Sequence, residues 1–222
     1  MKNLVRISLA ALALGVFASA ASAQTSGNVV WGALPGNGVT IAGDFGLGVN
    51  DDAKIGGAST MYFGGRLGYG ANMFSVYAVG GMYPIGNDFA DGEVTLGGGL
   101  AVHVMNQPAA PVSVSVQAGA GYIKFGDATQ MTFGGGPLLG INVPSTGVAI
   151  KPWLLPRVQY VKITDFDGEI GFGASGGLAV DMPMGLGFHL GLDWSSTDFG
   201  GATVKPLIVG VGVHYAIGAG AM

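Results

Sequence analysis

Residues 93–106, with the sequence EVTLGGGLAVHVMN, carry the pattern that decides the fold. Every second residue from Val94 to Val104 is large and apolar or glycine, and the residues between them, from Thr95 to His103, are small or polar. This period of two predicts a β-strand with one apolar face. The pattern recurs along the chain and predicts ten strands, at residues 39–50, 60–70, 73–83, 94–106, 112–125, 131–143, 148–163, 170–181, 185–195 and 204–217.

The composition indicates a membrane protein that crosses the bilayer without helices. Mean hydropathy is +0.50, and 10% of the residues are charged, against about 25% in typical soluble domains. Beyond the N-terminus no run of about 18 apolar residues occurs, and the 43 glycines disfavour helices. A closed β-barrel is the remaining structure in which every backbone N–H and C=O group in the lipid can form a hydrogen bond. We therefore predict an all-β fold, a single antiparallel transmembrane β-barrel of up-and-down topology over residues 38–217, with ten strands, or eight as the alternative.

The N-terminus has the features of a secretory signal peptide. Lys2 and Arg6 precede an apolar stretch at residues 9–17, and residues 21–23 (ASA) form a small-residue cleavage site. We assign residues 1–23 to the signal peptide, with a membrane-anchor helix as the alternative, residues 24–37 to a periplasmic leader and residues 218–222 to a C-terminal tail. Cleavage after Ala23 leaves a net charge of −6, which argues against nucleic acid as a partner.

The connections between the predicted strands alternate between two kinds. One kind is short or contains proline, and the other kind holds ten of the thirteen acidic residues, at residues 50–57, 84–93, 126–130, 164–169 and 196–202. This segregation predicts tight periplasmic turns at one end and acidic extracellular loops at the other. Aromatic residues near the strand ends predict two belts at the membrane interfaces, with Tyr83, Tyr122, Tyr160, Phe172 and Trp194 on the loop side and Tyr69 and Tyr215 on the turn side.

A soluble, lipocalin-like barrel is the other closed architecture. Its large apolar residues point inward around a ligand, and polar residues cover its exterior. In this chain the face opposite the large aliphatic residues is mostly Gly, Ala, Ser and Thr, which suits a lumen better than a surface in water. The pattern therefore favours the membrane barrel. Within it, Leu100 should face lipid and Gly99 the lumen, so a Gly99→Ser substitution should be mild.

Over residues 39–215 the chain resembles the small outer-membrane β-barrel proteins of Gram-negative bacteria, the OmpA/OmpW-like superfamily in the broad sense. Residues 210–215 (GVGVHY) look like the C-terminal assembly signal of such barrels, although this chain continues to Met222 and does not stop on an aromatic residue. The resemblance implies a location in the cell outer membrane. It also implies two partners, outer-membrane lipid with its lipopolysaccharide, and the barrel-assembly machinery during insertion.

Five charged or titratable residues are candidates for lining the lumen. Alternation places them on the small-residue faces of their strands, and they are Asp44, Arg66, Lys151, Arg157 and His189. Charged side chains are costly in lipid, so they should point inward, either hydrated or paired with one another. A second interpretation is a solute path with a cationic constriction from the two arginines and the lysine, since the inward glycines leave room for a narrow water column. The predicted function is therefore a structural barrel or a small passive pore, with an adhesin or receptor and an outer-membrane lipid-modifying enzyme as alternatives.

Asp44 and Arg66 lie on the first two predicted strands. If their hairpin centres near residue 55, residues whose numbers sum to about 110 oppose each other, which would make these two a cross-strand pair. A one-residue slip in register would separate them.

The sequence gives no firm sign of an enzyme. His103, His189 and His214 all fall in the predicted periplasmic half, and we expect no Ser or carboxylate beside any of them, hence no catalytic residue and no cofactor. Asp165, Asp167 and Glu169 have a spacing suited to a divalent cation, but solvated loop acids explain them equally well. The same holds for Asp88, Asp91 and Glu93, and we assign no metal site.

Overall fold

The computed structural model describes residues 37–218, except residues 56–57, 72, 86–87, 106–110 and 126–127. The predicted signal peptide, nearly all of the leader and most of the C-terminal tail lie outside these residues. Ten long strands are present: β1 (Gly38–Gly48), β4 (Met61–Ala71), β5 (Phe74–Ile85), β6 (Asp88–Met105), β7 (Val112–Phe125), β8 (Ala128–Ile141), β10 (Val148–Ile163), β11 (Glu169–Asp181), β12 (Leu186–Phe199) and β14 (Leu207–Ile217). In this part of the chain no helix is both long and apolar enough to span a membrane.

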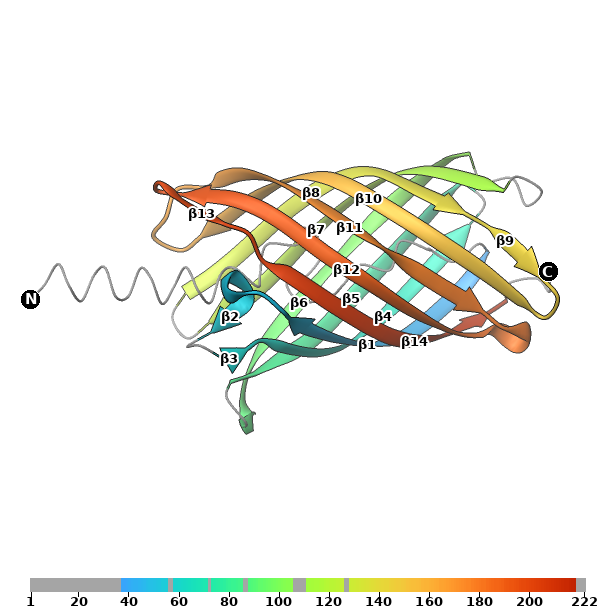
Figure 1. The fold of residues 1–222 in the computed structure, drawn as a ribbon, viewed down its shortest axis with the longest axis horizontal. Coiled ribbons are helices and arrows are strands. Elements are labelled where there is room, and N and C mark those ends of the chain that lie inside the picture. The colour runs from blue at the N-terminus through green and yellow to red at the C-terminus, as the bar shows by residue number, and fades with distance from the viewer. Residues whose placement is uncertain are drawn as a thin grey trace, which may run out of the picture.

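Each long strand pairs antiparallel with its neighbour in the chain, and β1 pairs with β14. The sheet therefore closes on itself, and the strands run obliquely around a barrel (Figure 1). Ten strands are confirmed, and the alternative of eight is wrong. The connections hold short elements: β2 (Lys54–Ile55), β3 (Ala58–Ser59), β9 (Val143–Ser145), β13 (Ala202–Val204) and the 3-10 turns η1 (Asp51–Ala53) and η2 (Pro183–Gly185).

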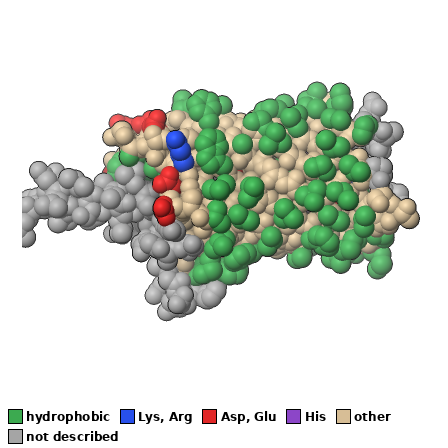
Figure 2. Space-filling view, in the orientation of Figure 1, with side chains coloured by type: hydrophobic (Ala, Val, Ile, Leu, Met, Phe, Trp, Pro, Cys, Tyr) green, Lys and Arg blue, Asp and Glu red, His purple; other side chains and the backbone are tan. Residues whose placement is uncertain are grey.

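The two faces of the wall have the polarity that the alternation predicted. On the exterior, large apolar side chains stay exposed, for example Leu67 at 56% and Leu100 at 49%. The interior buries polar side chains such as Gln117, which is 1% exposed. Figure 2 shows hydrophobic side chains over most of the wall, with acidic and basic ones gathered at the end that carries β2, β3 and β13 in Figure 1. An apolar exterior around a closed hydrogen-bonded wall is what a barrel in a lipid bilayer requires.

Several strands extend farther toward the loop end than the side-chain pattern indicated. β6 begins at Asp88, so the acidic run at residues 88–93 belongs to a strand, and its prediction as a loop was wrong. β8 likewise begins at Ala128, and a break at Lys205 and Pro206 separates β13 from β14. Backbone pairing does not depend on side-chain polarity, so ladders continue where the apolar pattern has ended.

One aromatic residue departs from the predicted belts. Tyr69, Tyr122, Tyr160, Phe172, Trp194 and Tyr215 are all exposed on the exterior, between 38% and 62%. Tyr83 is 2% exposed and packs against Tyr62, with ring centroids 5.5 Å apart. It shares a face of β5 with the buried Tyr77 and Val79, and its placement in the outer belt was wrong.

Candidate functional site

Long polar side chains on the inner face reach over a neighbouring strand to the next one, and glycines on the strand between make room for them. Tyr77 on β5 opposes Gly99 on β6 and receives a hydrogen bond of 3.1 Å from Gln117 on β7, two strands away. A Cβ at residue 99 would lie 2.5 Å from the Tyr77 hydroxyl oxygen and 2.5 Å from the Ala118 carbonyl oxygen. The expectation that Gly99→Ser is mild was therefore wrong. The inward glycine holds a neighbour's ring and does not simply widen a water column.

Two histidine side chains, on the neighbouring strands β12 and β14, also pass over a glycine of the adjacent strand. His189 on β12 opposes Gly212 on β14 and passes over it to Asp44 on β1, with Nε2 2.7 Å from Oδ1. His214 on β14 opposes Gly187 on β12 and reaches Asp181 on β11, with Nε2 2.8 Å from Oδ1. A Cβ at Gly212 would lie 2.5 Å from Nε2 of His189, so glycine is needed at the crossing. Each imidazole thus crosses the strand that carries the other.

The two imidazoles also meet each other. Their Nδ1 atoms are 3.3 Å apart and their ring centroids 5.5 Å apart, with the ring planes 27° from parallel. The centroids are farther apart than the two Nδ1 atoms by about the radius of one ring plus that of the other. Each Nδ1 atom therefore lies on the side of its ring that faces the other imidazole. An N–H···N hydrogen bond has this geometry.

Cations complete this chain of contacts at both ends. Arg66 on β4 contacts Asp44, with Nη2 3.4 Å from Oδ2, and Lys151 on β10 contacts Asp181, with Nζ 2.5 Å from Oδ2. The lower network, as we call it, therefore runs Arg66–Asp44–His189–His214–Asp181–Lys151. The network joins six strands. The Lys151–Asp181 pair, near the turn end, is partly exposed, and the Arg66–Asp44 pair is buried.

A second cluster, the upper network, lies nearer the loop end. Arg157 on β10 opposes Gly173 on β11 and binds Asp193 on β12 in bidentate fashion, with N–O distances of 2.7 and 3.2 Å. Ser175 on β11 accepts a bond from Arg157 and donates one to Asp193. The side chains of the ion pair are 1% and 3% exposed. A buried bidentate pair with its lone pairs satisfied fixes the relative positions of three strands.

All five lumen candidates point inward, and four of them lie in the lower network. Each of the three cations has a carboxylate partner: Asp44 for Arg66, Asp181 for Lys151 and Asp193 for Arg157. Charges that are paired in this way do not support the hypothesis of a cationic constriction. Asp181 was missed because it ends its strand, although it shares the alternation of Ser175 and Ala179.

The predicted Asp44–Arg66 pair is present, but its predicted register was wrong. Arg66 opposes Ala42, and Asp44 opposes Gly64, so the pairing register is displaced by two residues and the hairpin centres on residue 54 instead of residue 55. A displacement of two keeps both side chains on the inner face, and the long guanidinium reaches diagonally to the carboxylate. A register shift of two residues therefore preserves the contact, whereas a shift of one residue would have put the two side chains on opposite faces.

The expectation that no Ser or carboxylate lies beside the histidines was wrong for all three. His103 on β6 lies between Ser115 on β7, at 2.8 Å, and Ser75 on β5, at 3.3 Å. Both hydroxyls are buried, at 4% and 0% exposure, which leaves a substrate no approach to either oxygen in this conformation. The contacts join three strands near the turn end.

Three acids, Asp165, Asp167 and Glu169, lie where the chain passes from β10 to β11. Within the described part of the chain no three His, Asp or Glu side chains are grouped as metal ligands. Asp165 occupies a tight turn with a φ of 68°, between β10 and β11. Asp165 and Asp167 are exposed in this turn, and Glu169 is the first residue of β11.

A double-mutant cycle tests the Asp44–Arg66 contact. Asp44→Asn and Arg66→Gln should couple by about 0.5–3 kcal/mol, because the two buried charges touch. Unfolding free energies from denaturant titration in detergent micelles provide the measurement. The control cycle combines Arg66→Gln with Asp198→Asn, an exposed residue of β12, and should be additive. Additivity in both cycles would contradict the ion pair.

The sequence matches no known family model and no curated protein. Its fold matches solved outer-membrane barrels. The β domain of the Bordetella autotransporter BrkA aligns with a TM-score of 0.52 at 10% identity, over 82% of this chain and 100% of that one. LpxR from Salmonella typhimurium aligns with a TM-score of 0.47 at 10% identity, over 72% and 73% of the two chains. The shared fold and the apolar exterior are those of a small Gram-negative outer-membrane β-barrel.

Proposed function

We propose that this outer-membrane barrel is a structural element of the membrane and not a passive diffusion pore. Its lumen is closed by buried polar side chains that contact one another along the inner wall. The observation that carries the proposal is the lower network, in which six charged or titratable side chains form one chain of contacts across six strands. A solute path needs groups that remain available to water and ions. Here each charge is already neutralised by a neighbour, and separating a buried pair is costly.

The connections at the loop end support a structural role over that of an adhesin. Two residues separate β5 from β6, and two separate β7 from β8. These two connections offer little surface for a protein partner, because stable interfaces bury about 800 Å² on each side.

Single-channel recording in planar bilayers tests this function. We expect the refolded wild-type protein to give no discrete conductance steps, with heat-modifiable migration as the check that the barrel has formed. Arg66→Ala should produce steps, because it removes the cation at the deep end of the lower network. Leu67→Ala, on the lipid face of the same strand, should remain silent. Reproducible ohmic steps from the folded wild type would overturn the closed lumen and restore the passive pore.

A further inference from the structure

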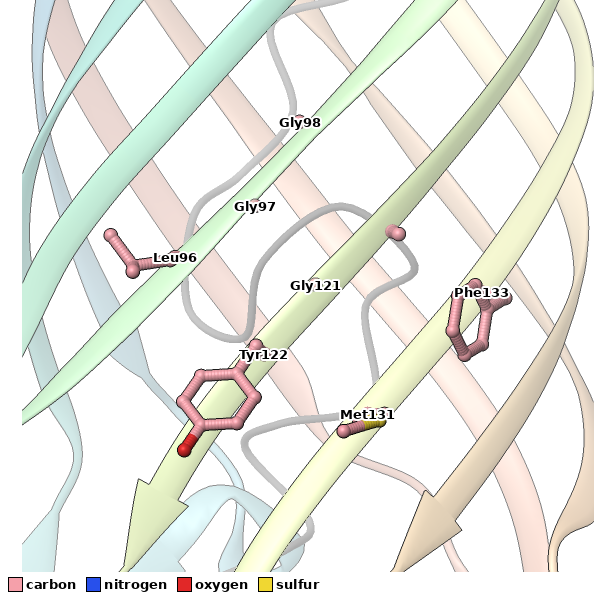
Figure 3. Close-up of a pocket in the computed structure, with 8 residues that line it drawn as sticks. Leu96, Gly97, Gly98, Gly121, Tyr122, Met131 and Phe133 are labelled. Atoms are coloured by element: carbon pink, nitrogen blue, oxygen red, sulfur yellow. The ribbon is translucent and has the colours of Figure 1, made fainter.

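The exterior wall has a shallow apolar groove over β6, β7 and β8. Its volume is about 530 Å³, and Figure 3 shows the residues that line it. The small residues Gly98 and Ala120, cross-strand neighbours, form its floor. Larger exposed side chains surround them, namely Leu96, Tyr122, Met131 and Phe133. A missing side chain between bulky neighbours leaves a depression that a slender apolar molecule can fill.

The groove lies in the half of the barrel nearer the loop end. Tyr122 comes three residues before β7 ends at Phe125, and Met131 three residues after β8 begins at Ala128. With acidic loops outward, this half belongs to the outer leaflet.

Two lysines lie between the groove and the loops. Lys162 on β10 is the cross-strand neighbour of Met131, and Lys124 follows Tyr122 by two residues on the same face of β7. Both are exposed. Lys162 donates a hydrogen bond of 2.5 Å to the Phe166 carbonyl oxygen, and in the part of the chain that the structure describes neither ammonium contacts a carboxylate. Each retains donors for an anion at the membrane interface.

We propose that this face binds one phosphorylated glycolipid of the outer leaflet, the lipid A part of lipopolysaccharide. One saturated acyl chain fills the groove, and phosphate groups contact Lys124 and Lys162. The apolar groove matches the acyl chain of the lipid. The two lysine ammonium groups, which lie between the groove and the loops, match its phosphates. The site is on the exterior and does not depend on whether the lumen is closed.

A second copy of the chain fits this surface less well. In a two-fold dimer within a membrane, the symmetry axis is parallel to the bilayer normal, so equivalent residues of both copies lie at the same depth. The lysines of one copy would therefore approach those of the other. Like charges disfavour that contact, whereas lipid phosphates neutralise it.

Native mass spectrometry of the refolded protein, titrated with purified lipid A in a neutral detergent, tests the site. The wild type should retain one lipid A, and it should retain less phosphatidylcholine, which lacks net charge. The double variant Lys124→Gln/Lys162→Gln should bind lipid A about tenfold more weakly or worse. Ala120→Leu, which fills the groove, should also weaken binding severalfold.

Matched controls use the same changes elsewhere on the barrel. Lys205→Gln removes an exposed lysine at the loop end beside β14, and Gly43→Leu adds a side chain to an open exterior position with no atom within 4 Å of its Cβ. Both should bind lipid A like the wild type. Equal binding by all variants, or equal retention of phosphatidylcholine, would overturn the proposal. So would a dimer that Ala120→Leu dissociates, which would assign the groove to a second copy.

Discussion

Replacing Asp193 by alanine is expected to destabilise the barrel by about 3–5 kcal/mol. Asp193 is the carboxylate that neutralises Arg157, and both side chains are almost completely buried. Its removal leaves a guanidinium in the interior with its counter-ion and the bidentate bonds lost, while Ser175 loses an acceptor. Uncompensated buried charge is among the largest single-residue penalties. Unfolding free energies from urea titration in lipid vesicles measure the effect.

Two controls separate loss of the ion pair from loss of a side chain. Asp198→Ala removes an exposed aspartate of the same strand and should change stability by no more than about 0.5 kcal/mol. Replacing Arg157 and Asp193 together by Met and Leu should recover much of the loss, because no buried charge then remains. Equal effects of Asp193→Ala and Asp198→Ala would contradict the upper network.

Leu100→Arg is expected to cost about 2–4 kcal/mol, the penalty for a cation on the lipid face near the bilayer midplane. Leu100 is exposed on the exterior in the middle of β6, opposite Val76 on one side and Ala118 on the other. The same vesicle titration measures it. Met73→Arg, at the turn that follows β4, should cost no more than about 1 kcal/mol, because the interface lies there. Equal costs at the two depths would mean that the exterior does not face lipid as assigned.

The alternation in the sequence predicted the barrel and its two faces because of the geometry of an extended chain. Successive side chains of a strand point to opposite sides, so the exposed Leu100 and the buried Ala101 follow from position alone. The same rule placed Asp44 and Arg66 in one interior although the register was displaced by two. It failed at Tyr83, where large side chains occupy the inner face of β5, and at residues 88–93, where backbone pairing continues under acidic side chains.

Sequence by itself therefore determined the fold class, the number of strands and the inward direction of the charged residues, because these depend on a local period and on the cost of charge in lipid. Only the tertiary structure decided which groups meet. His189 and Asp44 are 145 residues apart, and they come together because β1 closes against β14 and Gly212 lets the imidazole pass. A contact of this kind depends on the registers of several strand pairs at once and on the absence of one Cβ. No local pattern records either condition, so the sequence did not show that Gly99 and Gly212 make room for the side chains of Tyr77 and His189.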